Sequence, residues 1–555
     1  MNHSDHRVRI IPLGGLGEIG MNMTLLETEE DLVVIDAGLM FPEEEMLGID
    51  LVLPETTYLL EQREKVRGVV LTHGHEDHTG SLPFLLQQLP VPVFGTTLAL
   101  GLVQEKLREF GLDQTADLRR VKPGDTIPLG QISVEMVRVC HSIPDGVAVA
   151  ARTPAGLVLH SGDFKFDQTP VDGALTDYQR LAALGQEGVL ALLSDSTNAT
   201  REGITPSEST IRRTFEQIFQ SAPRRIIVAC FASNIHRIQQ VLEVAARLGK
   251  KVAVNGKSMT ANVRIASELG YLKIPPDTLV RLDELRQLPA AQGVIITTGS
   301  QGEPLSAVAR MAVGEHKQIE ILPGDTVVFS ARVIPGNEKS ISRTVNQLFK
   351  RGAQVITEDV HPGVHVSGHP SREELKLMLN LTRPKFFVPV HGEYRHLHAH
   401  AELAREMGIP AEHIFLLDNG DVLEVTPEQA RVVRKVLSGR VFVDGKGVGD
   451  VGDTVLRDRQ HLAQDGMVVV VIGFDQAGTV VAGPDIVSRG FAHLAEDDAL
   501  FEEARKLIMT VLEGCSVEEK TDWSLIKQRI RSVLRKFLQK AVDRRPMILP
   551  VIIEV

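Results

Sequence analysis

His73-Gly74-His75-Glu76-Asp77-His78 directly follows an apolar run, Val69 to Thr72, that has the composition of a buried strand. Three imidazoles and a carboxylate in one short loop are typical ligands of divalent metals. Residues two apart in an extended chain point the same way, so His73 and His75 can bind one ion together. Asp77 and His78 lie around the bend and can bind a second ion. The stretch therefore predicts a hydrolytic metal centre.

One loop cannot complete two coordination spheres, because each ion normally needs four or more ligands. Further donors are expected where other apolar runs end, since strands that end at one edge of a sheet deliver their polar side chains to a common cleft. Four such runs end at or just before a His or Asp: Ile132 to Cys140 before His141, Gly156 to His160 before Asp163, Val189 to Ser194 before Asp195, and Phe386 to Val390 before His391.

The chain of 555 residues is too long for one core and predicts three or four domains. Strand and helix patterns alternate between residues 207 and 365, which predicts a parallel α/β domain inserted into the first domain. A Gly- and Asp-rich stretch predicts a linker, and a small α/β domain follows it. The expected divisions are 1–206 and 366–440 for the first domain, 207–365 for the insertion, 441–465 for the linker and 466–555 for the C-terminal domain.

Composition favours a cytoplasmic protein without a membrane segment. The N-terminus lacks an apolar stretch behind a basic one, and no apolar run is long enough to span a bilayer. The three cysteines, Cys140, Cys230 and Cys515, are too far apart in sequence for a thiolate zinc motif or a disulfide frame. Cys140 precedes His141 in a strand, so it should face the core.

The formal charge of −12 taken alone argues against a nucleic-acid partner, but it says nothing about clustering. Ile526 to Arg545 holds eight Lys or Arg against one acid, with apolar residues at helical spacing. We interpret this run as a packed helix with a solvated basic face, and an RNA contact is the alternative. Ser516 and Glu519 have the spacing of a capping box for this helix.

Two other patterns have ordinary interpretations. Gly15 to Gly20 matches a dinucleotide fingerprint, with Asp36 at the right distance, but strand patterns follow it where a helix is required. For the loop Gly299 to Gly302 we likewise prefer the interpretation of a turn, and a phosphate-binding loop is the alternative. His396 and His400 are four apart without the acid of a metalloprotease motif, so we expect exposed helix residues there.

The donors, in order and context, resemble the ligand motifs of the metallo-β-lactamase superfamily, and Asp36 after Val33 to Ile35 resembles its first acidic motif. The insertion resembles the β-CASP branch, with Asp195, His369 and His391 in its motifs A, B and C. Leu13 to Gly20, Thr298 to Pro304 and the C-terminal segment resemble bacterial ribonuclease J over essentially the whole chain. This resemblance implies an αββα metallo-β-lactamase sandwich with an inserted α/β β-CASP domain and a small α/β C-terminal domain.

The resemblance also implies roles for individual residues. His73, His75 and His141 would hold one divalent metal, Zn²⁺ or Mn²⁺, Asp77, His78 and His391 the other, and Asp163 would bridge them. Asp77, His369 and Asp195 would be the catalytic residues, with His369 stabilising the scissile phosphate or protonating the leaving oxygen. Asp36 would orient a ligand. The remaining implied positions are Ser233, Asn234, His365, Ser367, Gly368 and His369 for a 5′ phosphate, and Gly48, Asp50 and Asp444 for a structural Ca²⁺.

One position departs from the family. Pro370 follows His369 where the family usually has Ala, and proline removes one backbone donor from the phosphate loop.

The function implied is a two-metal ribonuclease of RNA maturation and decay, 5′ to 3′ exonucleolytic on 5′-monophosphate ends with some endonuclease action. RNA would be the substrate. The resemblance further implies a homodimer or homotetramer and proteins of an RNA-decay assembly as partners. Two alternatives remain at this stage: a hydrolase of this fold that acts on DNA or a small thioester or lactam, and a non-catalytic RNA-binding scaffold.

Overall fold

A computed structural model gives the structure of residues 6–43, 45–301, 306–334, 337–476, 478–491, 498–516, 519 and 522–555. Gly302 to Pro304, part of one motif quoted above, lie outside the described residues. The chain divides into two compact units, residues 1–43 with 50–441 and residues 44–49 with 442–555.

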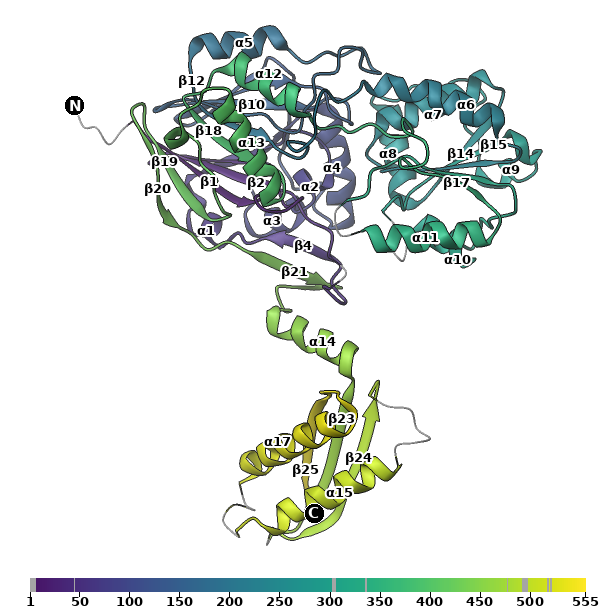
Figure 1. Cartoon of the computed structure of the whole chain (residues 1–555). Coiled ribbons are helices and arrows are strands. Elements are labelled where there is room, and N and C mark those ends of the chain that lie inside the picture. Colours follow the sequence, from purple (N-terminus) through teal and green to yellow (C-terminus); the bar gives the residue numbers. More distant parts are fainter. Residues whose placement is uncertain are drawn as a thin grey trace. The chain divides into compact units, whose positions relative to one another are not determined.

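The first unit contains two facing sheets (Figure 1). Between them lies a core of alternating apolar residues, among them Val33, Val134 and Val388, each fully buried or nearly so. The order of the eight-stranded sheet is β20 (Ala430–Lys435), β19 (Asp421–Val425), β1 (Val8–Gly14), β2 (Met23–Glu27), β3 (Leu32–Ile35), β5 (Val66–Val70), β6 (Val93–Gly95) and β7 (Leu118–Arg120). That of the six-stranded sheet is β18 (Phe386–Val390), β12 (Val189–Asp195), β11 (Gly156–His160), β10 (Val147–Thr153), β9 (Ile132–Arg138) and β8 (Thr126–Leu129).

Helices cover the outer face of each sheet, which completes the expected αββα sandwich. Leu59, Leu85 and Val103 bury one helical layer against the eight-stranded sheet. Leu184 and Leu379 bury another against the six-stranded sheet. The helices of the first layer are α1 (Thr57–Glu61), α3 (Leu82–Gln88) and α4 (Thr97–Glu109), and those of the second are α5 (Tyr178–Glu187), α12 (Arg372–Thr382) and α13 (Tyr394–Glu406). The short strand β4 (Leu51–Pro54) precedes α1.

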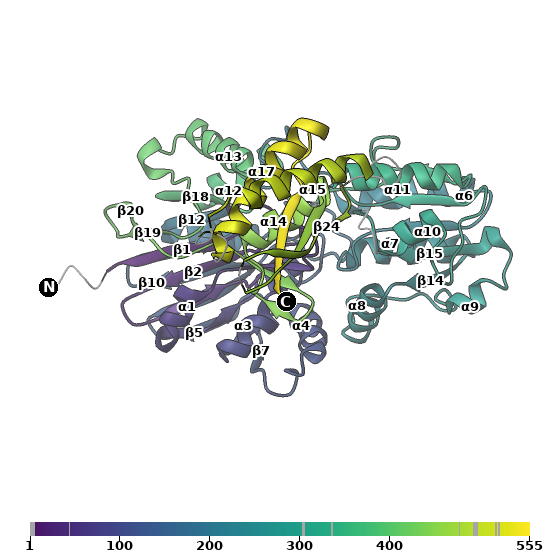
Figure 2. The same ribbon diagram turned by 90° about the horizontal axis from the view of Figure 1, so that it is seen from below.

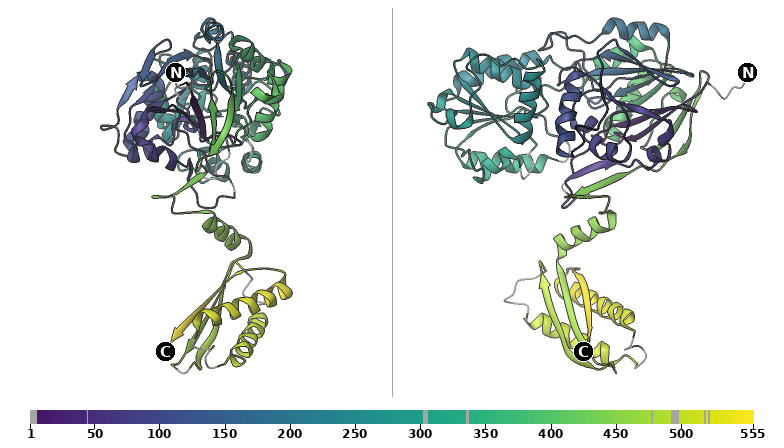
Figure 3. Two further views of the ribbon diagram at one scale, coloured as in Figure 1. Left: turned by 90° about the vertical axis from the view of Figure 1, so that its left-hand side faces the viewer. Right: turned by 180° about the vertical axis from the view of Figure 1, so that it is seen from behind.

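A five-stranded parallel sheet is inserted between β12 and β18, which are themselves paired in register from Ala191↔Phe386 to Asp195↔Val390. Helices cover both of its faces, as the alternating strand and helix pattern predicted (Figure 3). The sheet order is β14 (Lys251–Asn255), β15 (Gly293–Thr297), β13 (Ile226–Ala229), β16 (Thr326–Phe329) and β17 (Gln354–Ile356). The helices are α6 (Ile211–Ser221), α7 (Ile235–Arg247), α8 (Lys257–Glu268), α9 (Leu282–Leu285), α10 (Ala307–Val313) and α11 (Glu338–Lys350).

The inserted domain contacts the sandwich through α8, which lies beside α4 (Figure 2). Arg264 of α8 forms an ion pair of 2.9 Å with Glu105 of α4, and Lys257 forms one of 2.6 Å with Glu109. Each of these exposed ion pairs contributes little stability. They show that α8 of the inserted domain contacts α4 of the sandwich.

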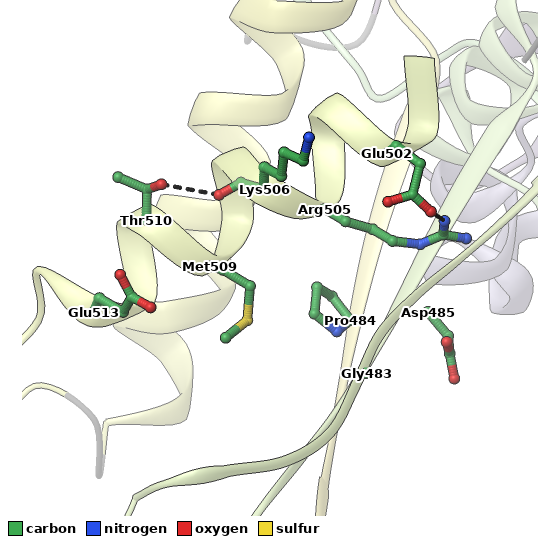
Figure 4. Close-up of a pocket in the computed structure, with 9 residues that line it drawn as sticks. All are labelled: Gly483, Pro484, Asp485, Glu502, Arg505, Lys506, Met509, Thr510 and Glu513. Atoms are coloured by element: carbon green, nitrogen blue, oxygen red, sulfur yellow. Dashed lines mark hydrogen bonds and ion pairs between the residues drawn. The ribbon is translucent and has the colours of Figure 1, made fainter. Parts of the chain in front are cut away.

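The second unit contains a three-stranded sheet with two helices packed on it. Its core includes Val470, Ile530 and Leu534, all almost fully buried. The elements are α14 (Asp453–Asp465), β23 (Met467–Phe474), β24 (Val480–Arg489), α15 (Asp498–Glu513), α17 (Trp523–Val542) and β25 (Met547–Glu554). Glu502, Arg505 and Met509 of α15 line a pocket together with Pro484 of β24 (Figure 4).

Two sequence interpretations change here. The stretch 441–465, expected to be a linker, contains α14 and the antiparallel pair of β21 (Arg440–Asp444) and β22 (Gly447–Val448). The basic helix begins at Trp523 and is capped by Asp522 rather than by Ser516. Ser516 and Glu519 do form the reciprocal capping-box bonds, at 3.0 and 3.2 Å.

Helix α17 buries Ile526, Ile530, Leu534 and Leu538, as the packed-helix interpretation requires. Four of its basic residues are exposed, Arg531, Arg535, Lys536 and Lys540, and two are half-buried, Lys527 and Arg529. Within the described residues, no helix combines the length and the low polarity that a membrane crossing needs.

We predict that Leu534→Ala lowers the free energy of unfolding of the C-terminal unit by about 2–5 kcal/mol, because it leaves a cavity in a packed core. Lys536→Ala, on the exposed face of the same helix, should change it by less than about 0.5 kcal/mol. Denaturant unfolding followed by circular dichroism measures both. Equal effects would mean that the helix does not pack by its apolar stripe.

Candidate metal centre

The structure brings all seven predicted metal ligands together at the ends of strands from both sheets. They come from the loop after β5, from the short helix α2 (Glu76–Thr79), and from the loops after β9, β11 and β18. Their donor atoms form two groups, and within each group the atoms lie within 4.8 Å of one another. The first group is His73, His75, His141 and Asp163, and the second is Asp77, His78, Asp163 and His391.

In the first group the imidazole nitrogens converge on one point. Nδ1 of His75 lies 3.0 Å from Nε2 of His73 and 3.2 Å from Nε2 of His141. Oδ2 of Asp163 lies 3.7 Å from Nε2 of His73 and 3.7 Å from Nε2 of His141. Ligands of a tetrahedral ion with bonds near 2.1 Å lie about 3.4 Å apart, so these separations fit one ion at the centre.

The second group shares Asp163. Its Oδ2 lies 3.3 Å from Nε2 of His78 and 3.5 Å from Nε2 of His391. Oδ2 of Asp77 lies 3.4 Å from the same nitrogen of His391. One carboxylate oxygen is therefore close to nitrogens of both groups, which is the position that a bridging ligand needs.

The opposite ring nitrogens have partners that fix the imidazoles. Nδ1 of His78 donates to Oδ2 of Asp36 (2.7 Å), and Nδ1 of His141 donates to the carbonyl oxygen of Gly368 (2.8 Å). Both partners are acceptors, so Nδ1 carries a proton in each ring and Nε2 is the nitrogen that faces the cluster. Nδ1 of His391 similarly lies 2.7 Å from Oγ1 of Thr197.

The electrostatics of the cluster also suit cations. Burial holds the pKa of His73 and of His141 well below the usual range and lowers that of His75 to about 4, so these imidazoles are neutral donors. Burial alone would raise the pKa of Asp163, but the surrounding histidines outweigh it and keep the carboxylate ionised. Without an ion, a proton on Nδ1 of His75 can form a hydrogen bond with either neighbouring nitrogen, at 3.0 and 3.2 Å, and a bound cation would replace that proton. The residues present therefore fit two divalent ions.

Asp36 makes the orienting contacts expected of it. Its Oδ1 accepts from the backbone N–H of Thr72 (2.7 Å), while its Oδ2 accepts from the Thr72 hydroxyl (2.8 Å) and from His78. Asp36 adopts φ = 61°, a left-handed conformation that Asp tolerates better than most residues. Nearby, a Cβ at Gly38 would lie 1.7 Å from the carbonyl oxygen of Asp77, so only glycine lets these loops meet.

His369 lies at the edge of the cluster and is paired with Asp195. Nδ1 of His369 lies 2.8 Å from Oδ2 of Asp195, and its ring centre is 4.9 Å from that of His141. Burial lowers the pKa of His369, but Asp195 more than compensates, so the pKa is raised and the ring can carry a proton. Geometry and charge thus agree with an acid beside the metal ligands.

The predicted phosphate-binding residues separate into two sets. Ser367 and Gly368 lie in the loop that carries His369, and a Cβ at Gly368 would come within 2.6 Å of the His141 ring. Asn234 caps α7 by accepting from the N–H of Arg237, and Ser233 precedes it. The link between the sets is Arg237, whose Nη1 lies 3.5 Å from Nδ1 of His365.

Several residues in the site were not singled out from the sequence. Thr197 binds both Asp195 and His391, and Asn198 binds Ser367 and His369. They closely follow Asp195, the residue assigned to motif A, which was the only signal for them. The side-chain amide of Asn22 lies 3.1 Å from Nε2 of His78, and no sequence pattern marked it.

The expectation that His396 and His400 are exposed was wrong. Both are buried, with 6% and 0% of their surface exposed, because α13 packs its inner face on the six-stranded sheet. Nδ1 of His400 lies 3.0 Å from Oγ of Ser196, beside Asp195. Cys140 is buried, as expected.

The possible calcium positions remain a prediction. In the second unit Asp444 pairs with Arg459, and a Cβ at Gly48 would lie 2.7 Å from Nη1 of the same arginine. Asp50 belongs to the first unit.

The αββα sandwich, the inserted parallel sheet and the paired His and Asp groups define a metallohydrolase of the metallo-β-lactamase superfamily. Comparison with known families agrees: residues 16–200 match "Metallo-beta-lactamase superfamily", and residues 352–415 match "Zn-dependent metallo-hydrolase RNA specificity domain". A solved Enterococcus faecalis protein of unknown function has the same fold, with a TM-score of 0.53 at 16% identity over 76% of this chain and 100% of its own.

The remaining comparisons identify the branch. Residues 223–348 match "Ribonuclease J, beta-CASP domain" and residues 454–555 match "Ribonuclease J C-terminal domain". The chain is 45% identical to Ribonuclease J2 of Bacillus subtilis, over 99% of both chains. It is 46% identical to Ribonuclease J of Thermus thermophilus, over 99% of this chain and 96% of that one. The chain belongs to the ribonuclease J family.

We predict that Asp36→Asn weakens metal binding about 10- to 100-fold, because the amide cannot accept from both Thr72 and His78 as the carboxylate does. Asn tolerates the same left-handed backbone, so the fold should persist. Competition with a chelator, with metal content read by mass spectrometry, measures the effect. An unchanged affinity at unchanged melting temperature would show that Asp36 does not orient His78.

Proposed function

We propose that this metal-dependent ribonuclease of the β-CASP branch removes nucleotides from the 5′ end of RNA, prefers 5′-monophosphate ends, and also cuts internally. The observation that supports this proposal most is the pair of buried donor groups that share Asp163, with His369 beside them. Phosphodiester hydrolysis needs an activated water, charge neutralisation and a proton for the leaving oxygen, and this site has groups suited to each task.

The residues divide the work as follows. His73, His75 and His141 would hold one ion, Asp77, His78 and His391 the other, and Asp163 both. When bound, two divalent cations would lower the pKa of a water and offset the charge that builds on the phosphate. The donor set, nitrogen and carboxylate without thiolate, suits Zn²⁺ and Mn²⁺ alike.

His369 would give its proton to the leaving 3′ oxygen of the scissile phosphodiester. Its ion pair with Asp195 keeps the ring protonated and fixes its orientation. Asp195 is itself held by Thr197, whose N–H and hydroxyl both donate to Oδ1. The acid is therefore held in place before the substrate arrives.

Binding of the terminal phosphate would use the loop from His365 to Gly368 with Ser233 and Asn234. Pro370 contributes no N–H there, so side chains such as Ser367 must supply more of the hydrogen bonds. A 5′ triphosphate carries more charge and volume than a pocket for one phosphate accommodates, which is why we propose a preference for monophosphate ends.

We further propose a cytoplasmic location, in keeping with three unpaired cysteines. Assembly into a dimer or tetramer and contact with proteins of an RNA-decay assembly are proposals from the family resemblance alone.

The proposed function predicts that purified protein loaded with Zn²⁺ or Mn²⁺ releases mononucleotides from 5′-monophosphate RNA at least about tenfold faster than from 5′-triphosphate RNA. A DNA oligomer of the same sequence should be degraded more slowly still. Chromatography of timed digests distinguishes these substrates. Faster cleavage of DNA would point to a DNA nuclease.

Asp77→Ala should lose RNA hydrolysis entirely, because a metal ligand is removed. If it kept RNA degradation in cells, a non-catalytic RNA-binding scaffold would be the better description of this chain.

A third prediction concerns the proposed acid, His369. His369→Ala should lower kcat on RNA by about 10²- to 10⁴-fold, the usual contribution of a general acid. The same variant should lose far less on bis(p-nitrophenyl) phosphate, because p-nitrophenolate leaves without a proton. Equal losses on both substrates would mean that His369 acts on the phosphate or the metal ligands instead.

A further inference from the structure

The segment that carries His369 returns from the inserted domain, and side chains of that domain hold its start. Arg237 of α7 is fully buried, and its Nε donates to Glu208 at 2.8 Å. Its Nη1 donates to the carbonyl oxygen of Ser330 at 2.7 Å. The Ser330 hydroxyl in turn donates to the carbonyl oxygen of Val364 at 2.6 Å. The segment is thus anchored to the loop after β16 as it leaves the insertion.

Asn198 holds the other end of the segment. This side chain is 3% exposed and follows β12 of the sandwich. Its Nδ2 donates to Oγ of Ser367 at 2.9 Å and to the carbonyl oxygen of His369 at 3.1 Å. Since an amide nitrogen has two hydrogens, both are used, and the backbone of His369 is held in one orientation.

The remaining acceptor of Asn198 is held by Arg332 of the inserted domain. Nη1 of Arg332 donates to Oδ1 of Asn198 at 3.1 Å. This bond fixes the plane of the amide, because an Asn side chain that could rotate would not keep both of its donors on the His369 segment. A cation at Oδ1 also polarises the amide and strengthens its donors.

Arg332 is fixed in turn by Gln301, which lies in the loop after β15 and is 3% exposed. Nε2 of Gln301 donates to the carbonyl oxygen of Arg332 at 2.6 Å, and its Oε1 accepts from the N–H of Ile334 at 2.8 Å. The loops after β15 and β16 are therefore tied together at the point where Arg332 reaches the sandwich.

We propose that Arg332 is a positioning residue for His369 and acts through Asn198. The proposal rests on the role of His369 given above and extends it: the inserted domain sets the position of the acid by a chain of hydrogen bonds from Gln301 to Arg332 to Asn198. Arg332 need not contact RNA for this. Its loss would let the Asn198 amide turn and would leave the carbonyl oxygen of His369 with the hydroxyl of Thr205 (2.8 Å) as its other donor, so that the imidazole would shift relative to Asp195.

The direct test is steady-state kinetics on 5′-monophosphate RNA. Arg332→Met, which keeps the length of the side chain but not its donor, should lower kcat about 10- to 100-fold with KM nearly unchanged. Arg332→Lys, which keeps a donor, should recover most of that loss. Arg343→Met removes the same charge from an exposed position on α11 and should leave kcat as in the wild type.

Asn198→Asp tests the donor and the acceptor of the Asn198 amide separately. Aspartate keeps the acceptor for Arg332 but places an oxygen against the carbonyl oxygen of His369. It should therefore lose as much kcat as Asn198→Ala. A double variant, Arg332→Met with Asn198→Ala, should be no worse than Asn198→Ala alone, because both changes break one chain of contacts. Additive losses, or a rise in KM alone, would mean that Arg332 binds RNA directly and would overturn the proposal.

Bis(p-nitrophenyl) phosphate provides the readout that a general structural defect would not give. Arg332→Met and Asn198→Asp should hydrolyse it at close to the wild-type rate, since no acid is needed. Equal losses on both substrates would place the damage at the metal ligands and contradict the proposal.

His369→Ala, measured in the same series, keeps the two hypotheses apart. If that variant retains full RNA hydrolysis, the proposed acid is wrong. If it is inactive while Arg332→Met is unaffected, only the positioning role fails.

Discussion

Everything in this structure depends on holding several uncharged imidazole nitrogens against one another inside the protein. Nδ1 of His75 lies 3.0 Å from Nε2 of His73 and 3.2 Å from Nε2 of His141, so a cation at this point would be within reach of all three nitrogens. Burial keeps these rings neutral, and the carbonyl oxygen of Gly368 on the far side of His141 fixes the tautomer of that ring. Metal binding would therefore stabilise the folded chain, because these ligands come together only when the chain is folded.

The sandwich is what makes this convergence possible. Loops that are far apart in sequence meet because β5, β9, β11, β12 and β18 all end near the same edge of the two sheets. Asp163 and His391 are separated by more than the whole inserted domain, yet Asp163 Oδ2 lies 3.5 Å from Nε2 of His391. The insertion leaves from β12 and returns to β18, two neighbouring strands. A large domain can thus be added without disturbing the site, and its own loops reach the position of His369.

The ligands and the fold could be predicted because their signals are local or belong to one specific set of motifs. The spacing of residues 73 to 78, the apolar runs that end in His or Asp, and the alternation of strand and helix between 207 and 365 each appear within short windows. The roles of His369 and Asp195 were predicted from the family resemblance alone. The structure adds the distance of 2.8 Å between Nδ1 of His369 and Oδ2 of Asp195.

What sequence could not provide are contacts made only in three dimensions. The sequence predicted that His400 is exposed, because the packing of α13 on the six-stranded sheet is not visible in it. It also predicted a linker where α14 lies, because glycines and aspartates surround that helix. Arg332 and Asn198 are 134 positions apart and joined by one hydrogen bond. No pattern in either segment predicts this contact. Positive φ at Asp36 and His391 is likewise invisible in the sequence, because neither residue type requires it.

Counting the ions bound to the metal-free chain tests the central claim most directly. Calorimetric titration with Zn²⁺ or Mn²⁺, checked by mass spectrometry of the intact protein, should give two ions per chain. A single ion, or none at concentrations well above those that load other zinc hydrolases, would contradict the paired donor groups on which this account rests.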